Sequence, residues 1–141
     1  MRNSQLAGTS QLALTSEFMP DNCRRLIEEE RHNERMINLY SIGNDWIAIE
    51  QSAYMLYKLF PKCAVLRANL PGSPFPVVMA LLKDKELKAY SREHIVQRPT
   101  PSHYVLLSKP INTSSFARWH RQQLNACHIF FRGLKSPKII T

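Results

Sequence analysis

Residues 76–83 read Pro-Val-Val-Met-Ala-Leu-Leu-Lys, and this stretch decides the fold. Alternate side chains of a strand point to opposite faces of its sheet, so an unbroken apolar run needs cover on both faces. The stretch therefore predicts a central strand that is buried on both sides. The remaining sequence must supply the strands beside it and the helices over it.

The sequence on either side predicts an antiparallel meander of three or four strands. Its segments are apolar or mixed, and residues that favour turns separate them. The expected strands are residues 63–70, 76–83, 86–96 and 103–108. Proline fixes φ and glycine frees it, so Leu70-Pro71-Gly72-Ser73-Pro74 is expected to form a turn. Asp84-Lys85 is expected to form the next turn, and Arg98-Pro99-Thr100-Pro101 to break the chain again.

Three helices are expected around this meander, over residues 21–40, 45–60 and 115–132. Asp21 or Asn22 can cap the first, whose charged middle leaves only its two ends to pack. The second carries apolar residues at helical spacing from Trp46 to Phe60, and we expect it to form the main helix of the core. Gly133 occupies the C-terminal cap position of the third.

The predicted fold class is α+β: an antiparallel, three- to four-stranded meander with two N-terminal helices and one C-terminal helix packed on one face. Residues 1–20 are rich in Ser, Thr, Gln and Asn, and we expect a flexible N-terminal arm there. Residues 21–141 are expected to form a single α+β domain. A chain of 141 residues with 44% hydrophobic residues is long enough and apolar enough to bury a core of its own.

Cysteine usage and hydropathy indicate the compartment. Cys23, Cys63 and Cys127 are odd in number, widely spaced and without a CxxC pair, which is typical of a reducing compartment rather than of a disulfide framework. No segment reaches the length of about 18 apolar residues that a membrane span needs. The start of the chain has no apolar run behind a basic cluster, as a signal peptide would. We expect a cytoplasmic or nucleoid-associated protein with no membrane partner.

Charge is divided unevenly along the chain, whose formal net charge is +8. Residues 1–60 carry 6 basic and 8 acidic residues, whereas residues 61–141 carry 13 basic and 3 acidic residues. After Glu93 there is no Asp or Glu, but there are seven Lys or Arg residues and four of the five histidines. A folded segment with positive and no negative charges attracts polyanions. The composition therefore indicates nucleic acid or an acidic protein as partner.

A polar ridge on the last predicted helix is the candidate binding site. The candidate nucleic-acid-binding residues are Arg118, Arg121, Asn125, His128, Arg132, Lys135 and Lys138. The first five recur at intervals of three or four residues, which places them on one side of a helix. Arg can donate two parallel hydrogen bonds to guanine or phosphate, and Asn can pair with adenine. The alternative is an ordinary solvated face, although such a face usually carries acidic residues as well.

Two further sets of residues would extend this interface. No helix-turn-helix pair precedes the helix, which favours binding to the nucleic-acid backbone, with affinity from counterion release. If the predicted hairpin lies beside the helix, its basic residues join the same face: Lys62, Arg67, Lys83, Lys85, Lys88 and Arg92. If the target is single-stranded, Trp119 or Tyr104 would stack on bases.

Three weaker patterns point to chemistry. Their residues are Asp84, Glu86 and Lys88; His94, His103, His120 and Cys127; and Cys63 or Cys127 with a histidine. The first alternates as in metal-dependent nucleases, but lacks a nearby further acid to hold Mg²⁺. The second has zinc-binding residue types without the short spacing of structural zinc sites. The third has the residue types of nucleophilic catalysis. We assign no catalytic residue, metal site or cofactor from them.

The sequence thus predicts a small, basic, non-enzymatic protein that binds DNA or RNA, or associates with nucleic acid as an accessory. The alternative hypothesis is a protein-interaction or inhibitor module whose basic surface meets an acidic protein. In that case the helix over residues 21–40 would serve as the arm of a homodimer.

Overall fold

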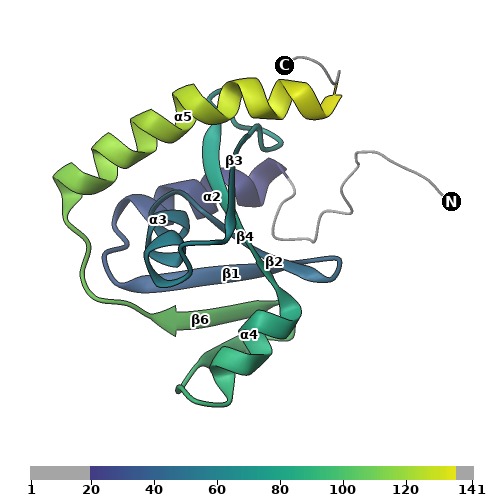
Figure 1. The fold of residues 1–141 in the computed structure, drawn as a ribbon, viewed down its shortest axis with the longest axis vertical. Coiled ribbons are helices and arrows are strands. Elements are labelled where there is room, and N and C mark those ends of the chain that lie inside the picture. The colour runs from purple at the N-terminus through teal and green to yellow at the C-terminus, as the bar shows by residue number, and fades with distance from the viewer. Residues whose placement is uncertain (1–19, 136–141) are drawn as a thin grey trace, which may run out of the picture.

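The structure is a computed structural model that describes residues 20–135 and the side chains of residues 22–126. Its elements are α2 (Pro20–Arg31), β1 (Met36–Ile42), β2 (Asp45–Ile49), α3 (Glu50–Leu59), β3 (Ala64–Ala68), β4 (Val77–Lys83), α4 (Asp84–Ser91), β5 (Gln97–Thr100), β6 (His103–Leu107) and α5 (Thr113–Lys135). Figure 1 shows their arrangement. The predicted arm of residues 1–20 lies outside the described residues except for Pro20, where α2 begins.

The predicted α+β class is confirmed, but the sheet is larger than expected and is not a simple meander. Its order is β3-β4-β2-β1-β6-β5, and each neighbouring pair is antiparallel. Six strands are described where three or four were expected. The sheet consists of three hairpins, which the pairings β2–β4 and β1–β6 join side by side.

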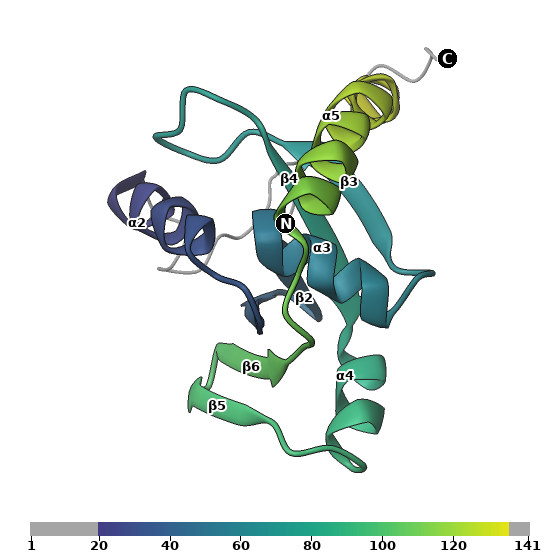
Figure 2. The same cartoon turned by 90° about the vertical axis from the view of Figure 1, so that its left-hand side faces the viewer.

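Helices cover both faces of the sheet, whereas the sequence placed all of them on one face. Figure 2 shows α2 set apart from α5 and α4, and the two apolar cores place α2 on one face of the sheet and α3, α4 and α5 on the other. Leu26 of α2 packs with Ile47 in one apolar core. Leu56 of α3, Leu87 of α4 and Trp119 of α5 belong to the opposite core. Among residues 20–135, no helix is both long enough and apolar enough to cross a bilayer.

The strand β4 confirms the central, doubly covered strand predicted from residues 76–83. Its side chains alternate between the two cores: Val78 and Ala80 pack in one, Val77 and Met79 in the other, and all four are buried. It lies between β3 and β2.

Four further predictions are confirmed with shifts at the ends of the elements. The strands expected over residues 63–70 and 103–108 are β3 and β6, and the helix expected over residues 115–132 is the core of the longer α5. Asn112 caps α5, since its Oδ1 accepts from the N–H of Ser115 at 2.8 Å. The turn expected over residues 70–74 is also present, and Gly72 within it has a φ of 79°.

The predicted helix over residues 21–40 is wrong beyond Arg31, where α2 ends. The side chain of Asn33 accepts from the backbone N–H of Met36 at 3.0 Å and donates to its carbonyl oxygen at 2.6 Å. Such side-chain bonds compete with helix continuation. From Ile37 onward the chain is a strand with both faces covered, since Ile37 and Leu39 pack in one apolar core and Tyr40 and Ile42 in the other. This correction removes the long helix on which the predicted dimer arm depended.

The predicted helix over residues 45–60 is two elements, β2 and α3. The residues from Trp46 to Ile49 are all buried, and they pair with β1 and β4. Gly43 and Asn44 form a two-residue connection between β1 and β2, in which Gly43 has a φ of 61°. Glycine at the first position of such a connection is typical of a tight hairpin. The apolar run fits both helix and strand spacing, and pairing with two neighbouring strands decides between them.

The predicted turn at residues 84–85 and the strand over residues 86–96 are also wrong, because α4 spans residues 84–91 and residues 92–96 connect it to β5. The carboxylate of Asp84 accepts from Trp46 Nε1 at 2.9 Å and pairs with Lys88 one turn later at 3.0 Å. Leu87 between them is buried in the core. These contacts fix the first turn of a helix against the start of β2.

The predicted break at residues 98–101 overlaps β5, an edge strand whose four residues are all exposed. Proline cannot donate to a strand ladder, so it is tolerated at an edge or an irregularity. Pro99 meets both conditions, because the pairing with β6 shifts register between Gln97 and Thr100.

Candidate functional site

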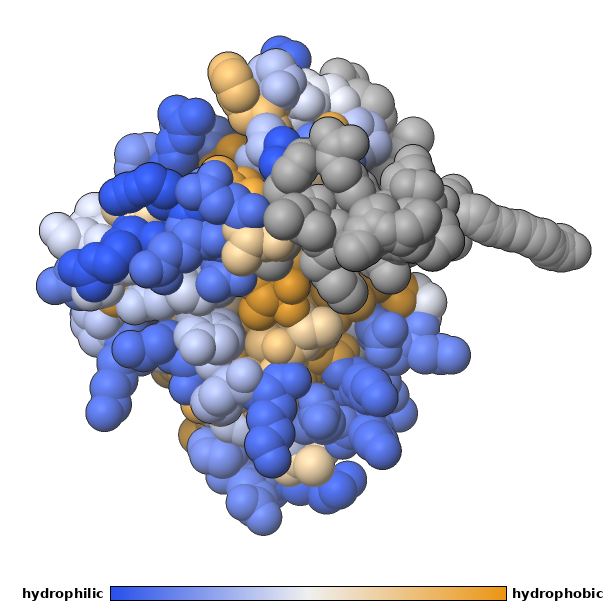
Figure 3. Space-filling model, turned by 45° about the horizontal axis from the view of Figure 1, so that its top comes forward, coloured by the Kyte–Doolittle hydropathy of each residue, from blue (hydrophilic) through white to orange (hydrophobic). Residues whose placement is uncertain are grey.

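The helix α5 packs against the sheet with one side and presents the other to solvent. It contacts β3, β4 and α3, and Phe116 and Trp119 pack in the core. Arg118, Arg121 and Asn125 are exposed. Figure 3 shows that the face of the molecule carrying α5 is mostly hydrophilic, with a hydrophobic area at its centre.

The structure brings these three residues onto one strip of α5, which we call the α5 ridge. At about 100° per residue, Arg118, Arg121 and Asn125 fall within an arc of about 60° around the helix axis. The other candidates lie beyond the described side chains. His128, Arg132 and Lys135 belong to the described backbone of α5 only, and Lys138 is outside the described residues.

The charge of the α5 ridge is not compensated within the described part of the molecule. Neither Arg118 nor Arg121 forms an ion pair with a carboxylate of residues 22–126. The paired surface carboxylates belong to α2 and α4, where Glu28, Glu29 and Asp84 meet basic neighbours on their own helices. The ridge therefore carries a local positive potential.

Most of the basic residues expected to join this face do not. Lys85 and Lys88 lie on α4 and Arg92 directly follows it, and Figures 1 and 2 show α4 at the opposite end of the molecule from α5. Lys83 directly precedes α4. Arg67 belongs to β3, the strand that α5 contacts most. The expectation failed because residues 84–91 form a helix rather than a hairpin beside α5.

The two aromatic residues expected to stack on bases are packed within the fold. Trp119 is only 8% exposed, and its ring lies 5.1 Å from that of Tyr54. The half-buried Tyr104 packs edge-on against Trp46 at 4.9 Å. Among the Phe, Tyr and Trp side chains of residues 22–126, Phe75 is the one that is exposed, at 72%. Its position between Pro74 and Pro76 was the available sequence signal, because neither proline can donate to a strand ladder.

A cavity of about 420 Å³ lies between α2 and α5, and the connection between β3 and β4 forms its third side. We call it the α2–α5 pocket. Glu50 and His120 line it together, and His120 Nε2 lies 2.9 Å from Glu50 Oε1. The same carboxylate oxygen accepts from the backbone N–H of Val78 at 2.9 Å. The two partners are 70 residues apart, so no spacing in the sequence predicts this pair.

The backbone of Glu50 is strained. Its φ of 53° is the only positive φ of a non-glycine residue in the described part of the chain. Such a conformation costs about 1–3 kcal/mol and persists only where surrounding contacts hold it. The hydrogen bonds to Val78 and His120 supply those contacts. Strain of this kind clusters at ligand sites, which draws attention to the α2–α5 pocket.

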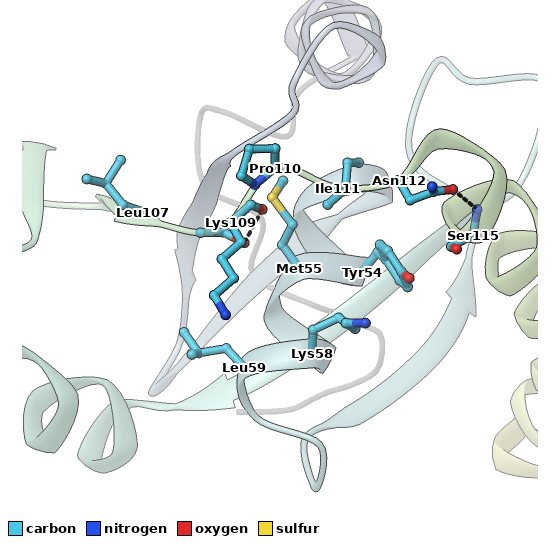
Figure 4. A pocket seen from close by; sticks show the side chains of 11 residues that line it. Tyr54, Met55, Lys58, Leu59, Leu107, Lys109, Pro110, Ile111, Asn112 and Ser115 are labelled. Atoms are coloured by element: carbon cyan, nitrogen blue, oxygen red, sulfur yellow. Dashed lines mark hydrogen bonds between the residues drawn. The ribbon is translucent and has the colours of Figure 1, made fainter.

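A second, larger cavity of about 580 Å³ lies between α3 and the segment that joins β6 to α5. We call it the α3 pocket. Figure 4 shows Tyr54 and Met55 of α3 opposite Pro110 and Ile111. Two lysines, Lys58 and Lys109, line it, and no acidic residue does. The pocket therefore combines an apolar floor with positive charge.

Three observations on the described residues concern the patterns that suggested chemistry. No group of three or more His, Cys, Asp or Glu side chains there is placed to hold a metal ion. Asp84 is engaged by Trp46 and Lys88, and these two hydrogen bonds lower the pKa of its carboxyl. Burial, with a contribution from Glu86, raises the pKa of the Cys63 thiol to about 11, which opposes thiolate chemistry. The side chain of Cys127 is outside the described residues.

Comparisons of the chain with protein-family models, with curated proteins and with solved structures found no match.

Proposed function

We propose that this protein is a non-enzymatic nucleic-acid-binding or nucleic-acid-associated accessory protein that contacts phosphates through α5. The observation that carries the proposal is the α5 ridge, where Arg118 and Arg121 are exposed and without an acidic partner among the described residues. Guanidinium groups bind phosphate oxygens through paired, charge-assisted hydrogen bonds. The absence of any acid after Glu93 supports the same proposal.

The arrangement favours contact with the backbone of the nucleic acid over sequence readout. Half to two-thirds of protein–DNA hydrogen bonds go to phosphate and sugar, and these carry no sequence information. Asn125 is the one described ridge residue that suits adenine, whereas Arg118 and Arg121 can bind phosphate as well as guanine. Affinity should therefore come mainly from counterion release and fall steeply with salt.

A salt titration of binding tests this proposal. The variant R118Q/R121Q removes two positive charges from exposed positions. We expect the slope of log K against log salt on duplex DNA to become shallower by about 1.8, at about 0.9 per lost phosphate contact. The matched control K85Q/R92Q removes two charges from exposed positions, one on α4 and one directly after it, so it has the same net charge as R118Q/R121Q.

The control distinguishes an effect of the α5 ridge on binding from an effect of the protein's net charge. If the control loses as much affinity and slope as R118Q/R121Q, the net charge and not α5 governs binding. If R118Q/R121Q binds as the wild type does, the proposed role of α5 is wrong. RNA and single-stranded DNA should be titrated in the same way as duplex DNA, because phosphate contacts from the α5 ridge do not distinguish these nucleic acids.

The α3 pocket favours a second candidate function, the binding of an acidic protein. Its apolar floor suits an apolar side chain, and Lys58 and Lys109 suit flanking carboxylates. The variant K58Q/K109Q should weaken binding of an acidic, leucine-containing peptide and leave the binding of DNA unchanged. Equal peptide binding by this variant and the wild type would contradict this second candidate.

A further inference from the structure

The α2–α5 pocket places an exposed aromatic ring beside two arginines, and the carboxylates of Glu28 and Glu50 line it as well. Phe75 lines the pocket from the Pro74-Phe75-Pro76 segment. The flanking prolines remove two backbone donors, so this segment stays outside the strand ladder and holds its ring at the surface. An exposed, rigidly placed ring is the kind of platform on which a nucleobase stacks.

Two guanidinium groups on α2 face the same pocket. Arg24 forms no ion pair with the side chains of residues 22–126. Arg31 pairs with Glu28 at 3.4 Å, but both side chains are more than half exposed. Solvent weakens such a pair, so Arg31 can exchange it for a phosphate at little cost.

The inner wall of the pocket offers hydrogen-bonding atoms. Glu50 Oε1 is occupied by His120 and Val78, whereas its Oε2 has no hydrogen-bond partner among the described residues. His120 uses Nε2 toward Glu50, so its Nδ1 is free of partners within the described part. A carboxylate oxygen and an imidazole nitrogen can accept from or donate to the edge of a base, or a sugar hydroxyl.

The pocket adjoins the α5 ridge on the same helix. His120 and Leu124 line the pocket, and Arg121 follows His120 at about 100° around the helix axis. A strand with phosphates along the ridge would thus pass the mouth of the pocket. The volume of about 420 Å³ lies within the range of about 300–1,000 Å³ typical of small-molecule sites.

We propose that the α2–α5 pocket is a nucleotide subsite. The base stacks on Phe75, the phosphate lies at Arg24 and Arg31, and the polar edge meets Glu50 and His120. This inference rests on the proposed function, which supplies a polymeric ligand. That ligand must be a single strand, because bases within a duplex are stacked and paired and cannot reach the ring of Phe75. A free nucleotide has the same chemistry, and the experiment separates the two sources.

The test compares three probes: a labelled thymidine strand of about 12 nucleotides, a duplex of the same length, and thymidine monophosphate. In the variant F75A, we expect single-strand affinity to fall about 10-fold with an unchanged salt slope, because stacking releases no counterions. Duplex affinity should stay the same. The control I95A removes an apolar side chain that is 90% exposed and does not line the pocket, so it should change nothing. R24Q/R31Q should make the single-strand slope shallower by about 1.4.

The outcomes separate this inference from the proposed function. If F75A binds the strand and the monophosphate as the wild type does, the subsite is wrong, even where R118Q/R121Q still weakens binding to duplex. If the wild type binds the monophosphate in a Phe75-dependent way but binds no strand or duplex, the subsite stands and the proposed function fails. If no probe binds, both are wrong.

Discussion

Replacing Glu30 by alanine should destabilise the fold by about 3 kcal/mol, because four donors converge on this buried carboxylate. The side chain comes from α2, and Glu30 is 2% exposed. Its Oε1 accepts from the backbone N–H of Ser52 at 2.8 Å and from Asn33 Nδ2 at 3.1 Å. Its Oε2 accepts from Ser52 Oγ at 2.7 Å and from Asn38 Nδ2 at 3.1 Å. The carboxylate thus joins α2 to β1 and to the first turn of α3.

The expected loss in E30A depends on which donors would be left without a hydrogen-bond acceptor. The hydroxyl of Ser52 and the amide of Asn33 can both turn to the carbonyl oxygen of Met36, at 3.2 Å and 2.6 Å. The N–H of Ser52 and the amide of Asn38 have no second acceptor among the described residues. Each stranded donor costs about 1–3 kcal/mol, and the half-buried Asn38 lies toward the lower end. Their sum, reduced by the desolvation that the missing carboxylate no longer incurs, is about 3 kcal/mol.

The isosteric variant E30Q supplies the control. One amide oxygen keeps two of the donors, and the amide nitrogen can donate to Ser52 Oγ, so we expect a loss of only about 1 kcal/mol. Burial raises the pKa of the Glu30 carboxyl, so the folded state favours its protonated form more than the unfolded state does. The contribution of such a group to the free energy of unfolding is greatest below the pKa that the group has in the unfolded state, and it declines as the pH rises above that value. The advantage of wild type over E30Q should therefore be larger at about pH 4 than at about pH 7.

Urea and thermal unfolding, followed by far-ultraviolet circular dichroism, measure both effects. A loss of about 3 kcal/mol corresponds to a melting temperature lower by about 10 °C in a chain of this size. If E30A unfolds within about 0.5 kcal/mol of the wild type, the convergence of donors on Glu30 does not hold the elements together, and the reasoning is refuted.

Three further predictions follow from particular residues. Gly43→Ala should cost about 1 kcal/mol in urea unfolding, because φ is 61° while a Cβ there would meet nothing within 4 Å; a loss above about 3 kcal/mol would contradict this. Burial raises the pKa of the Cys23 and Cys63 thiols to about 11. Each thiol of the folded protein should therefore react with a disulfide reagent about 100-fold more slowly than the same thiol after unfolding in guanidinium. Equal reaction rates in the folded and unfolded protein would refute this prediction. Leu106→Ala, at a fully buried position, should lower the free energy of unfolding by about 3 kcal/mol. Leu107→Ala, at a position that is 62% exposed, should change it by less than about 0.5 kcal/mol. Similar losses in the two variants would show that the described packing of β6 is wrong.

The sequence predicted the fold class, β3, β4, β6 and α5, because each of these has a single physical signal. The run from Val77 to Leu82 has no polar residue to place on a solvated face. The segment after Asn112 combines a capping side chain with helical spacing of Phe116 and Trp119. In such segments local preference and tertiary packing agree, so local reasoning suffices.

The errors lie where two local signals compete or where a distant partner decides. The run Trp46-Ile-Ala-Ile49 fits a helix or a strand, and only pairing with β1 and β4 settles it. Asp84 reads as a turn residue, but the indole of Trp46, 38 residues earlier, makes it the first residue of α4. Of the candidate site, the ridge followed from helical spacing alone. The Glu50–His120 pair did not, because the two residues are 70 positions apart and only the tertiary fold brings them together.

That pair also connects the fold to the surface that the proposal depends on. Phe116 and Trp119 fix the position of α5 over the core, but a helix held by apolar contacts alone can rotate by a fraction of a turn at modest cost. The contact of His120 with Glu50 is directional and partly buried, and Glu50 is itself held by the backbone of β4. It therefore sets the rotation of α5 about its axis. With that rotation fixed, Arg118 and Arg121 face solvent, and their charge is available to a partner.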